Sequence, residues 1–402
     1  MPRPSRPPAR DPSRSVAILG AFSFFLSAIE YTFPKPLPFM RLGIANLPLL
    51  LAVDILPLPS YFLLVFVKFA GMGLVSGTLI SYVAVFSLAG TLASALAMRG
   101  TRFFLRSSVS HLGISVVGAM ASAASQILMA RWLVFGEAAW AIAPLFLGAS
   151  LVTGSLLGLF ADRFVESSRW YSGAGPDAPA DTEGARSTRP SRNGRSIRNW
   201  YESFAPERLA LAGLLVALAL LFQPLLAFKA ALVAALALLL ILSGTRIKPV
   251  ATMMVVASIV AANLAIPVGR VLARLGPFAV TETALLEGIG KALVFEGLIF
   301  VSRLALRPGL SFPGSFGRAL GEAFATWQRI MEMGPNFRPS SFVKDADALL
   351  LRLETEESAQ YAIEDLGGGE AGAARFGPRD LALAAGVAAA LALLVAGRLA
   401  AR

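Results

Sequence analysis

The sequence predicts an all-α integral membrane protein that crosses the bilayer many times. Hydrophobic residues make up 56% and charged residues 15% of the 402 residues, whereas soluble domains have roughly 45–50% and 25%. The mean hydropathy is +0.66. Many apolar runs reach the roughly 20 residues that a helix needs to cross a bilayer. We therefore expect a multi-pass protein of the cell inner (cytoplasmic) membrane, in contact with the lipid bilayer.

Cysteine and histidine content excludes several kinds of chemistry. The chain has no cysteine, which excludes disulfides, thiolate catalysis and iron–sulfur ligation. A single histidine, His111, argues against a histidine-based metal site, and we expect it to lie at the membrane interface. The net charge of +11 comes with arginines that cluster between apolar spans. That placement is typical of cytoplasmic loops, so we expect no nucleic-acid partner, and no metal or cofactor.

The first module is predicted to contain six spans. Residues 1–14 form a basic leader that we expect to stay in the cytoplasm, because no small-residue cleavage site follows it. Residues 15–165 then hold spans at roughly 15–30, 43–57, 61–76, 79–98, 111–131 and 144–162. With a cytoplasmic N-terminus, the arginine-rich segments 99–106 and 163–208 both return to the cytoplasm, in agreement with the positive-inside rule.

A linker separates this module from a second one. Residues 166–205 are rich in Gly, Ala, Pro, Ser and Arg and lack apolar periodicity, so they are predicted to be disordered. Residues 206–306 hold four expected spans, at roughly 208–223, 225–243, 250–267 and 283–303. In the last of these, Glu287 and Lys291 have the i, i+4 spacing of a helical ion pair.

Residues 307–379 are predicted to be cytoplasmic. Large apolar residues recur there at helical spacing with charged residues between them, which indicates an amphipathic helix. These residues are Phe316, Leu320, Phe324, Trp327 and Met331. A second helix over 345–357 and a Gly-rich break at 367–369 follow. Residues 380–402 contain a final span, so the second module has about five spans in all.

The segment from Glu30 to Asn46 carries a distinctive pattern. Glu30 ends the first span, a proline-rich connection leads to Arg41, and the second span opens with Leu42-Gly43-Ile44-Ala45-Asn46. Together with further matches, this resembles the Gx transporter family, whose members are often labelled heptaprenyl diphosphate synthase component I. That family usually has His-Asn where this chain has Ser122-Ala123. The further matches are Lys68, Ser87-Leu88-Ala89-Gly90, Gly113-Ile114-Ser115, Gly118-Ala119 and Gln126.

The resemblance implies a transport function. The family is similar to the six-helix substrate-binding components of energy-coupling factor (ECF) transporters. The second module looks, less closely, like their transmembrane coupling component, with Gly317-Arg318-Ala319 where that component carries Ala-Arg-Gly-type motifs. This implies uptake of a small vitamin- or cofactor-like molecule. A separate ATPase would supply the energy, because the chain has no Gly-x-x-x-x-Gly-Lys-Ser/Thr loop.

Five residues are candidates for binding the small molecule, because polar and ionisable groups in apolar spans are costly and mark functional sites by default. They are Glu30, Arg41, Asn46, Lys68 and Gln126. Asn46 offers both donors and acceptors, and the guanidinium of Arg41 can bind an anion through two parallel hydrogen bonds. No catalytic residue is predicted.

Each candidate also has a structural alternative. Glu30 and Arg41 can instead lie among lipid headgroups, where charge costs little. Lys68 lies in the middle of an apolar run, and we favour a structural pair with Asp54 over contact with a ligand. Gln126 faces either the same cavity or a neighbouring helix.

The resemblance suggests two further functions. Prenyl diphosphate synthesis, the reaction in the family label, needs aspartate clusters that hold magnesium and diphosphate. The chain has no Asp-Asp-x-x-Asp motif, so we expect it not to be an enzyme. The alternative is an accessory role in flavin- or quinone-linked membrane electron transfer, or in isoprenoid or quinone metabolism. Since the chain lacks haem and iron–sulfur ligand sets, it would then bind or deliver a carrier.

Overall fold

The computed structural model describes residues 11–32, 43–173, 204–244, 249–265, 269–275, 278–306, 312, 314–333, 341–364 and 378–400. Helices account for 89% of these residues. Five helical stretches in this part of the chain are long and apolar enough to cross a membrane: Pro12–Glu30, Leu58–Ser76, Tyr82–Leu105, His111–Ser167 and Leu383–Ala400. The prediction of an all-α, polytopic membrane protein is confirmed.

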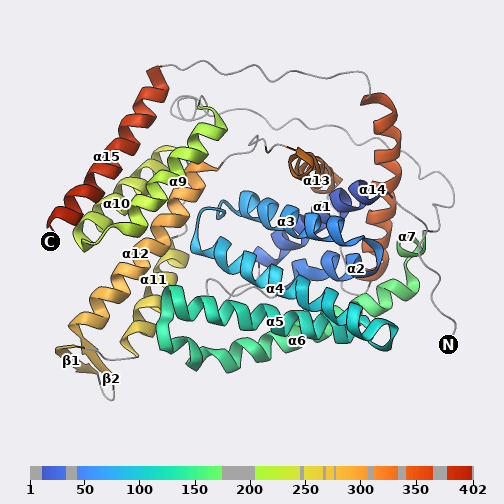
Figure 1. Cartoon of the computed structure of the whole chain (residues 1–402), viewed down its shortest axis with the longest axis horizontal. Helices are drawn as coiled ribbons and strands as arrows, with labels where there is room; N and C mark the ends of the chain where they lie inside the picture. The colour runs from blue at the N-terminus through green and yellow to red at the C-terminus, as the bar shows by residue number, and fades with distance from the viewer. Residues whose placement is uncertain are drawn as a thin grey trace.

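The first module is a bundle of helices α1 to α6 (Figure 1). Its expected second span is short, because η1 and α2 together cover only Ile44–Ile55, about 18 Å at 1.5 Å per residue. It begins after Gly43, whose φ of 84° lies in the left-handed region that glycine adopts without strain. The bounds are α1 (Pro12–Thr32), η1 (Ile44–Asn46), α2 (Leu47–Ile55), α3 (Leu58–Ser76), α4 (Tyr82–Leu105), η2 (Arg106–Ser108), α5 (His111–Ala130), η3 (Arg131–Phe135), η4 (Gly136–Ala138) and α6 (Ala139–Ser167).

Helix α13 (Gly314–Met333) covers the first module. In Figure 1 it is seen almost end-on, whereas α1 and α3 run across the view, so it crosses them steeply. The ring centroids of Phe24 and Phe324 are 5.2 Å apart, and Ala323 lies directly over Gly20. The amphipathic helix is therefore present as predicted, but its apolar face is buried on α1 and α3. That face includes Ala319, Leu320, Ala323 and Ile330.

Helix α14 (Phe342–Glu364) holds the end of α6 and the short helix α7 (Arg169–Ser172). The carboxylate of Asp347 accepts hydrogen bonds from the Ser168 hydroxyl and from the backbone N–H of Trp170, the latter at 2.9 Å. The Trp170 side chain is only 1% exposed. The linker expected from residue 166 therefore does not begin there, since a buried tryptophan and this capping carboxylate keep 166–173 folded. Residues 174–203 of that linker, which was predicted over 166–205, lie outside the described residues.

The second module contains α9, α10, α11, α12 and α15, as Figure 1 shows at its left. A small antiparallel hairpin precedes α12, with Leu275 opposite Phe278. This hairpin is not predicted from the sequence, because its strands are too short to stand out beside the long apolar runs. The bounds are α9 (Pro206–Phe222), α10 (Leu226–Leu242), α11 (Pro249–Leu264), β1 (Val271–Leu275), β2 (Phe278–Thr281), α12 (Glu282–Ala305) and α15 (Pro378–Ala400).

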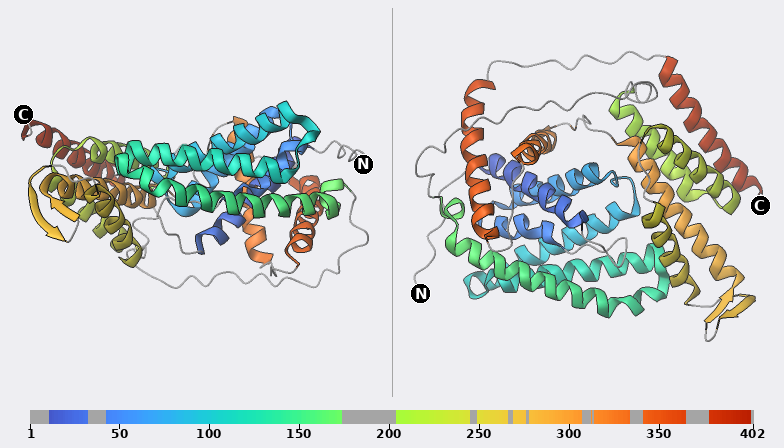
Figure 2. Two further views of the ribbon diagram at one scale, coloured as in Figure 1. Left: turned by 90° about the horizontal axis from the view of Figure 1, so that it is seen from below. Right: turned by 180° about the vertical axis from the view of Figure 1, so that it is seen from behind.

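The two modules pack against each other through α11 and α12. The backbone N–H of Ile80, in the turn between α3 and α4, donates a 3.0 Å hydrogen bond to the Ser302 hydroxyl on α12. Nearby, Phe295 of α12 joins one apolar cluster with Phe86 and Phe146 of the first module. Figure 2 shows the modules side by side from two further directions.

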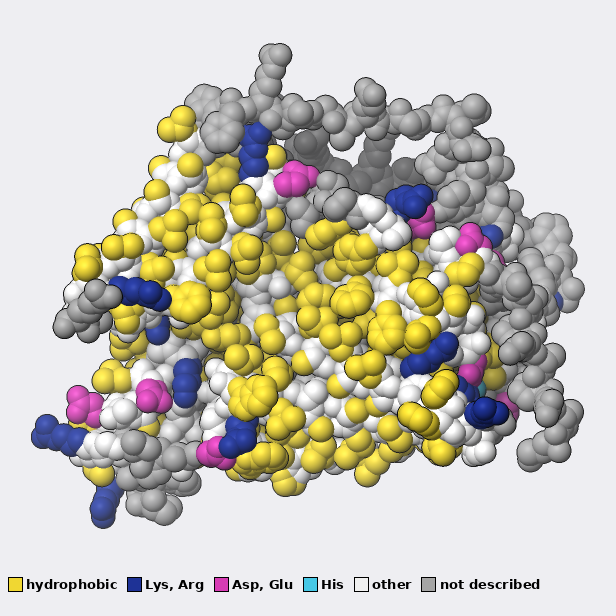
Figure 3. Space-filling model, in the orientation of Figure 1, with side chains coloured by type: hydrophobic (Ala, Val, Ile, Leu, Met, Phe, Trp, Pro, Cys, Tyr) yellow, Lys and Arg dark blue, Asp and Glu magenta, His cyan; other side chains and the backbone are white. Residues whose placement is uncertain are grey.

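The outer surface is strongly apolar. Large hydrophobic side chains of α6 are exposed, among them Leu145, Val152 and Leu156. In Figure 3 hydrophobic side chains cover most of the visible face, and charged side chains gather mainly toward its edges. A surface of this kind suits contact with lipid chains, because a soluble protein rarely exposes a contiguous apolar area larger than a few hundred Å².

Candidate functional site

Four of the five candidate residues meet in one buried place in the first module. Glu30 at the end of α1, Asn46 of η1, Lys68 of α3 and Gln126 of α5 line the same small cavity, of about 20 Å³. A second cavity of about 20 Å³ adjoins it and shares Asn46 and Gln126 as lining residues. The fifth candidate, Arg41, lies outside the described residues.

The charged groups of this cavity are deeply buried. Glu30 is 3% exposed and Lys68 is 2% exposed. The Lys68 ammonium donates a hydrogen bond to the side-chain oxygen of Asn46. The backbone N–H of Ala45 donates to a carboxylate oxygen of Glu30 at 3.4 Å. Three elements that are separate in sequence thus bring opposite charges and an amide into one low-dielectric space, where electrostatic interactions are strong.

Two glycines of the resemblance pattern shape this cavity. A side chain at Gly90 would place its Cβ 2.8 Å from both the Gln126 amide nitrogen and the Ser122 hydroxyl, closer than atoms can approach. Glycine at position 90 therefore leaves room for these two polar groups between α4 and α5. Gly43, with its left-handed backbone, turns the chain so that Asn46 follows directly at the cavity.

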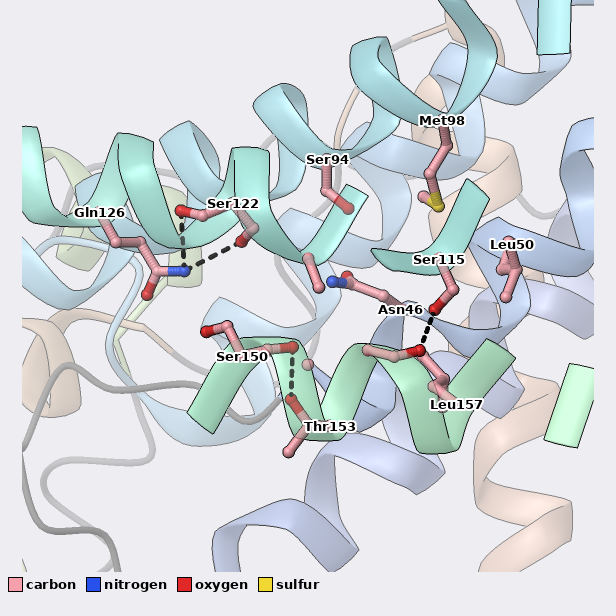
Figure 4. Close-up of a pocket in the computed structure, with 13 residues that line it drawn as sticks. Asn46, Leu50, Ser94, Met98, Ser115, Ser122, Gln126, Ser150, Thr153 and Leu157 are labelled. Atoms are coloured by element: carbon pink, nitrogen blue, oxygen red, sulfur yellow. Dashed lines mark hydrogen bonds between the residues drawn. The ribbon is translucent and has the colours of Figure 1, made fainter. Parts of the chain in front are cut away.

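Hydroxyl groups line the adjoining cavity, as Figure 4 shows. They come from Ser94, Ser115, Ser122, Ser150 and Thr153, on α4, α5 and α6. The amide nitrogen of Gln126 donates to the Ser122 hydroxyl at 3.0 Å, and the Ser115 hydroxyl donates to the carbonyl of Gly154 at 2.7 Å. Within the described structure, Oε1 of Gln126 is buried without a hydrogen-bond partner. It is an acceptor available to a donor in the cavity.

These hydroxyls were not predicted from the sequence. Ser115 and Ser122 are seven residues apart on α5, two helical turns, which places them on one face. That spacing is a usable signal, but serine is common in membrane helices, where it also forms helix–helix hydrogen bonds. Gln126 lines both cavities, which is the first of the two alternatives given for it. Its amide nitrogen donates a hydrogen bond to Ser122 of its own helix.

The favoured pair of Lys68 with Asp54 is wrong. Asp54 lies near the other end of the bundle, where its carboxylate is 2.5 Å from the Arg102 guanidinium and 3.1 Å from Nε2 of His111. His111 also contacts Asp162 of α6 through Nδ1, at 3.1 Å. This polar cluster ties α2, α4, α5 and α6 together, so His111 does more than lie at an interface.

The second module has a separate polar group. Lys291 lies 3.6 Å from Glu287, which confirms the predicted ion pair. It also donates a 2.7 Å hydrogen bond to the side-chain oxygen of Asn263 on α11. Glu296, further along α12, is within 3.5 Å of the Thr252 hydroxyl. None of these five residues lines the polar cavities of the first module.

Fold and site together define a helical membrane protein with a buried polar cavity in its first module. Residues 19–164, which form that module, match the family model described as heptaprenyl diphosphate synthase component I. Residues 207–308 match a domain of unknown function (DUF8519). No curated protein and no solved structure matches the chain. The first module is therefore similar to component I of that synthase, as the sequence pattern indicated.

Proposed function

We propose that the protein is a membrane transport component that binds a small polar molecule in the cavity of its first module. The observation that carries this is the convergence of Glu30, Asn46, Lys68 and Gln126 from four elements. Burying two charges in a membrane protein is costly, and such groups mark substrate paths. The free acceptor on Gln126 and the surrounding hydroxyls suit a molecule with several donors and acceptors, such as a vitamin or cofactor precursor.

The cavity size adds a requirement. A volume of about 20 Å³ holds roughly one water molecule, whereas small-molecule sites usually have about 300–1,000 Å³. Binding of a vitamin-sized molecule therefore requires the lining helices to separate. Transport by such a module thus consists of alternate opening and closing of the bundle.

Residues outside the first module contact both α3, which carries Lys68, and the turn that follows α3. Helix α13 packs on α3, and Ser302 and Arg303 of α12 contact the turn that follows it. Motion of the second module is thus passed to α3 and to the cavity. This arrangement supports a coupling role for the second module, driven by a separate ATPase that would be a partner subunit. We propose no catalytic activity for the chain.

The alternative is a role in isoprenoid or quinone metabolism, or in flavin- or quinone-linked electron transfer. The label of the matching family names one component of a prenyl diphosphate synthase, and so favours a place in a membrane-associated complex. The polar cavity argues for transport over this alternative. An isoprenoid chain has no groups that form hydrogen bonds with buried charges and hydroxyls.

The test compares two matched asparagines. Asn46 accepts a hydrogen bond from Lys68, and Asn263 accepts one from Lys291. The protein is purified from its own membranes in mild detergent, and bound small molecules and co-purified proteins are identified by mass spectrometry. We expect a polar metabolite that is lost in Asn46→Ala and retained in Asn263→Ala, together with an ATPase subunit. Equal loss in both variants, or a bound quinone alone, would refute the transport assignment.

A further inference from the structure

A much larger cavity lies in the second module, between α9, α10, α12 and α15. Its volume is about 580 Å³, within the range of about 300–1,000 Å³ that small-molecule sites occupy. Ser243 is the one polar residue among the described residues that line it. The walls are otherwise apolar, formed by residues such as Leu209, Val216, Leu236, Val301, Val387 and Leu393. We call this space the apolar chamber.

The apolar chamber is elongated and has two different ends. Along α10 its lining runs from Leu232 to Ser243, about 16 Å at 1.5 Å per residue. Beyond the Leu232 end, the Gln223 amide donates a 2.9 Å hydrogen bond to the carbonyl of Leu393 and ties α15 to the end of α9. Ser243 marks the opposite end. A hydrogen bond between two helices thus lies beyond one end of the chamber, and the other end carries the polar residue.

Small residues leave this space unfilled. Gly386 of α15 lines the chamber, and a Cβ at that position would meet no atom within 4 Å. Helices with small residues normally pack closely in membranes, but at Gly386 no neighbouring helix in the described part of the chain approaches α15. An apolar chain lying in this space makes dispersion contacts along all its walls. Ordered water is a poor occupant of such walls, because an ordered water molecule needs two to four polar partners.

We propose that the apolar chamber binds the long hydrocarbon chain of one lipid molecule, with the polar head of the lipid at the Ser243 end. A hydrocarbon chain contacts the apolar walls over a length of about 16 Å. The chain has two chemical sources, the acyl chain of a glycerophospholipid and the isoprenoid chain of a quinone or polyprenyl phosphate. This site is independent of the polar cavity in the first module.

The test fills the chamber from two of its walls. Gly386→Phe on α15 and Ala235→Phe on α10 both place a ring in the chamber, because both positions line it. The full-length protein is washed by repeated detergent exchange, lipids per chain are counted by native mass spectrometry, and extracted lipids are identified. We expect one retained lipid per wild-type chain and a roughly tenfold loss in each variant, equivalent to about 1.4 kcal/mol.

Matched controls lie on the same helices, outside the lining. Ala388→Phe and Ala234→Phe add the same ring at exposed positions and should retain the lipid. Unfolding temperatures are measured for all four variants, so that a variant that misfolds is set aside and the variant on the other wall decides. A phospholipid or an isoprenoid that is lost only in the variants that fill the chamber supports the proposal. Its chemical identity shows which of the two sources the chain comes from. A wild-type chain without retained lipid, or equal retention in filled and control variants, overturns it.

Discussion

Gly90 shows how a single missing side chain maintains the polar cavity. Ser122 and Gln126 approach α4 so closely that a methyl group at position 90 would lie 2.8 Å from both. The same helix also carries Gly100, where an added Cβ meets no atom within 4 Å. Alanine substitutions at the two positions therefore distinguish two effects on stability. Crowding at the cavity acts only at position 90, and helix propensity acts at both positions.

We expect Gly90→Ala to destabilise the protein and Gly100→Ala to leave it unchanged or slightly more stable. The first substitution forces Gln126 and Ser122 aside, at a cost of about 1–3 kcal/mol. The second removes a flexible glycine from a helix, a gain of about 0.5–1 kcal/mol. Thermal unfolding in detergent measures both, and equal midpoints for the two variants would contradict the packing described at Gly90.

At the scale of elements, the contact between α14 and α7 depends on one carboxylate. Asp347 accepts hydrogen bonds from the Ser168 hydroxyl and from the N–H groups of Arg169 and Trp170. It therefore caps a helix that follows α6 directly, and it does so from a helix that follows α12 in the chain. Asp345, two residues earlier in α14, accepts a hydrogen bond from Ser341 of its own segment.

We expect Asp347→Ala to release α7 from α14 and expose Trp170, at a local cost of about 1–3 kcal/mol for the unsatisfied groups. Both acidic residues lie near the start of α14 and interact similarly with its helix dipole, so Asp345→Ala is the matched control. Limited proteolysis and quenching of tryptophan fluorescence report the release. Identical cleavage of the two variants would show that the cap does not hold α7.

At the scale of the whole molecule, the modules are joined by more than the chain between them. The Ile80–Ser302 hydrogen bond and the cluster around Phe295 connect α12 to the first module, and α13 packs on α1. Phe295 is 1% exposed, whereas Phe222 on α9 is 57% exposed. The first side chain belongs to the contact between modules, and the second lies on the outer surface.

We expect the two modules to stay together after the chain is cut by a protease site placed within 174–203. Phe295→Ala should then weaken the association of the two fragments, because truncating a buried phenylalanine costs about 3–5 kcal/mol. Phe222→Ala should leave the association of the fragments unchanged, because Phe222 lies on the outer surface. Size-exclusion chromatography in detergent distinguishes one peak from two, and fragments that part without any substitution would refute a stable contact between the modules.

Much of this architecture was predictable because apolar run length fixes where helices cross a membrane. The polar cavity followed from the same logic, since residues such as Lys68 and Gln126 interrupt apolar runs and must find partners. The partner itself was not predictable. Lys68 bonds to Asn46 and not to Asp54, because sequence does not give the rotation of one helix against another. The hairpin and the burial of α13 depend on the same tertiary packing.

The packing of α13 on α1 has a consequence for how the protein is made. Phe24 is fully buried, and its neighbour Phe324 lies 300 positions later in the chain. During synthesis the first module reaches the membrane long before the helix that covers it has left the ribosome. Contacts of such long sequence separation form late. The face of α1 that includes Gly20 and Phe24 therefore stays without α13 for most of translation, and the bundle is completed only after α12 has been synthesised.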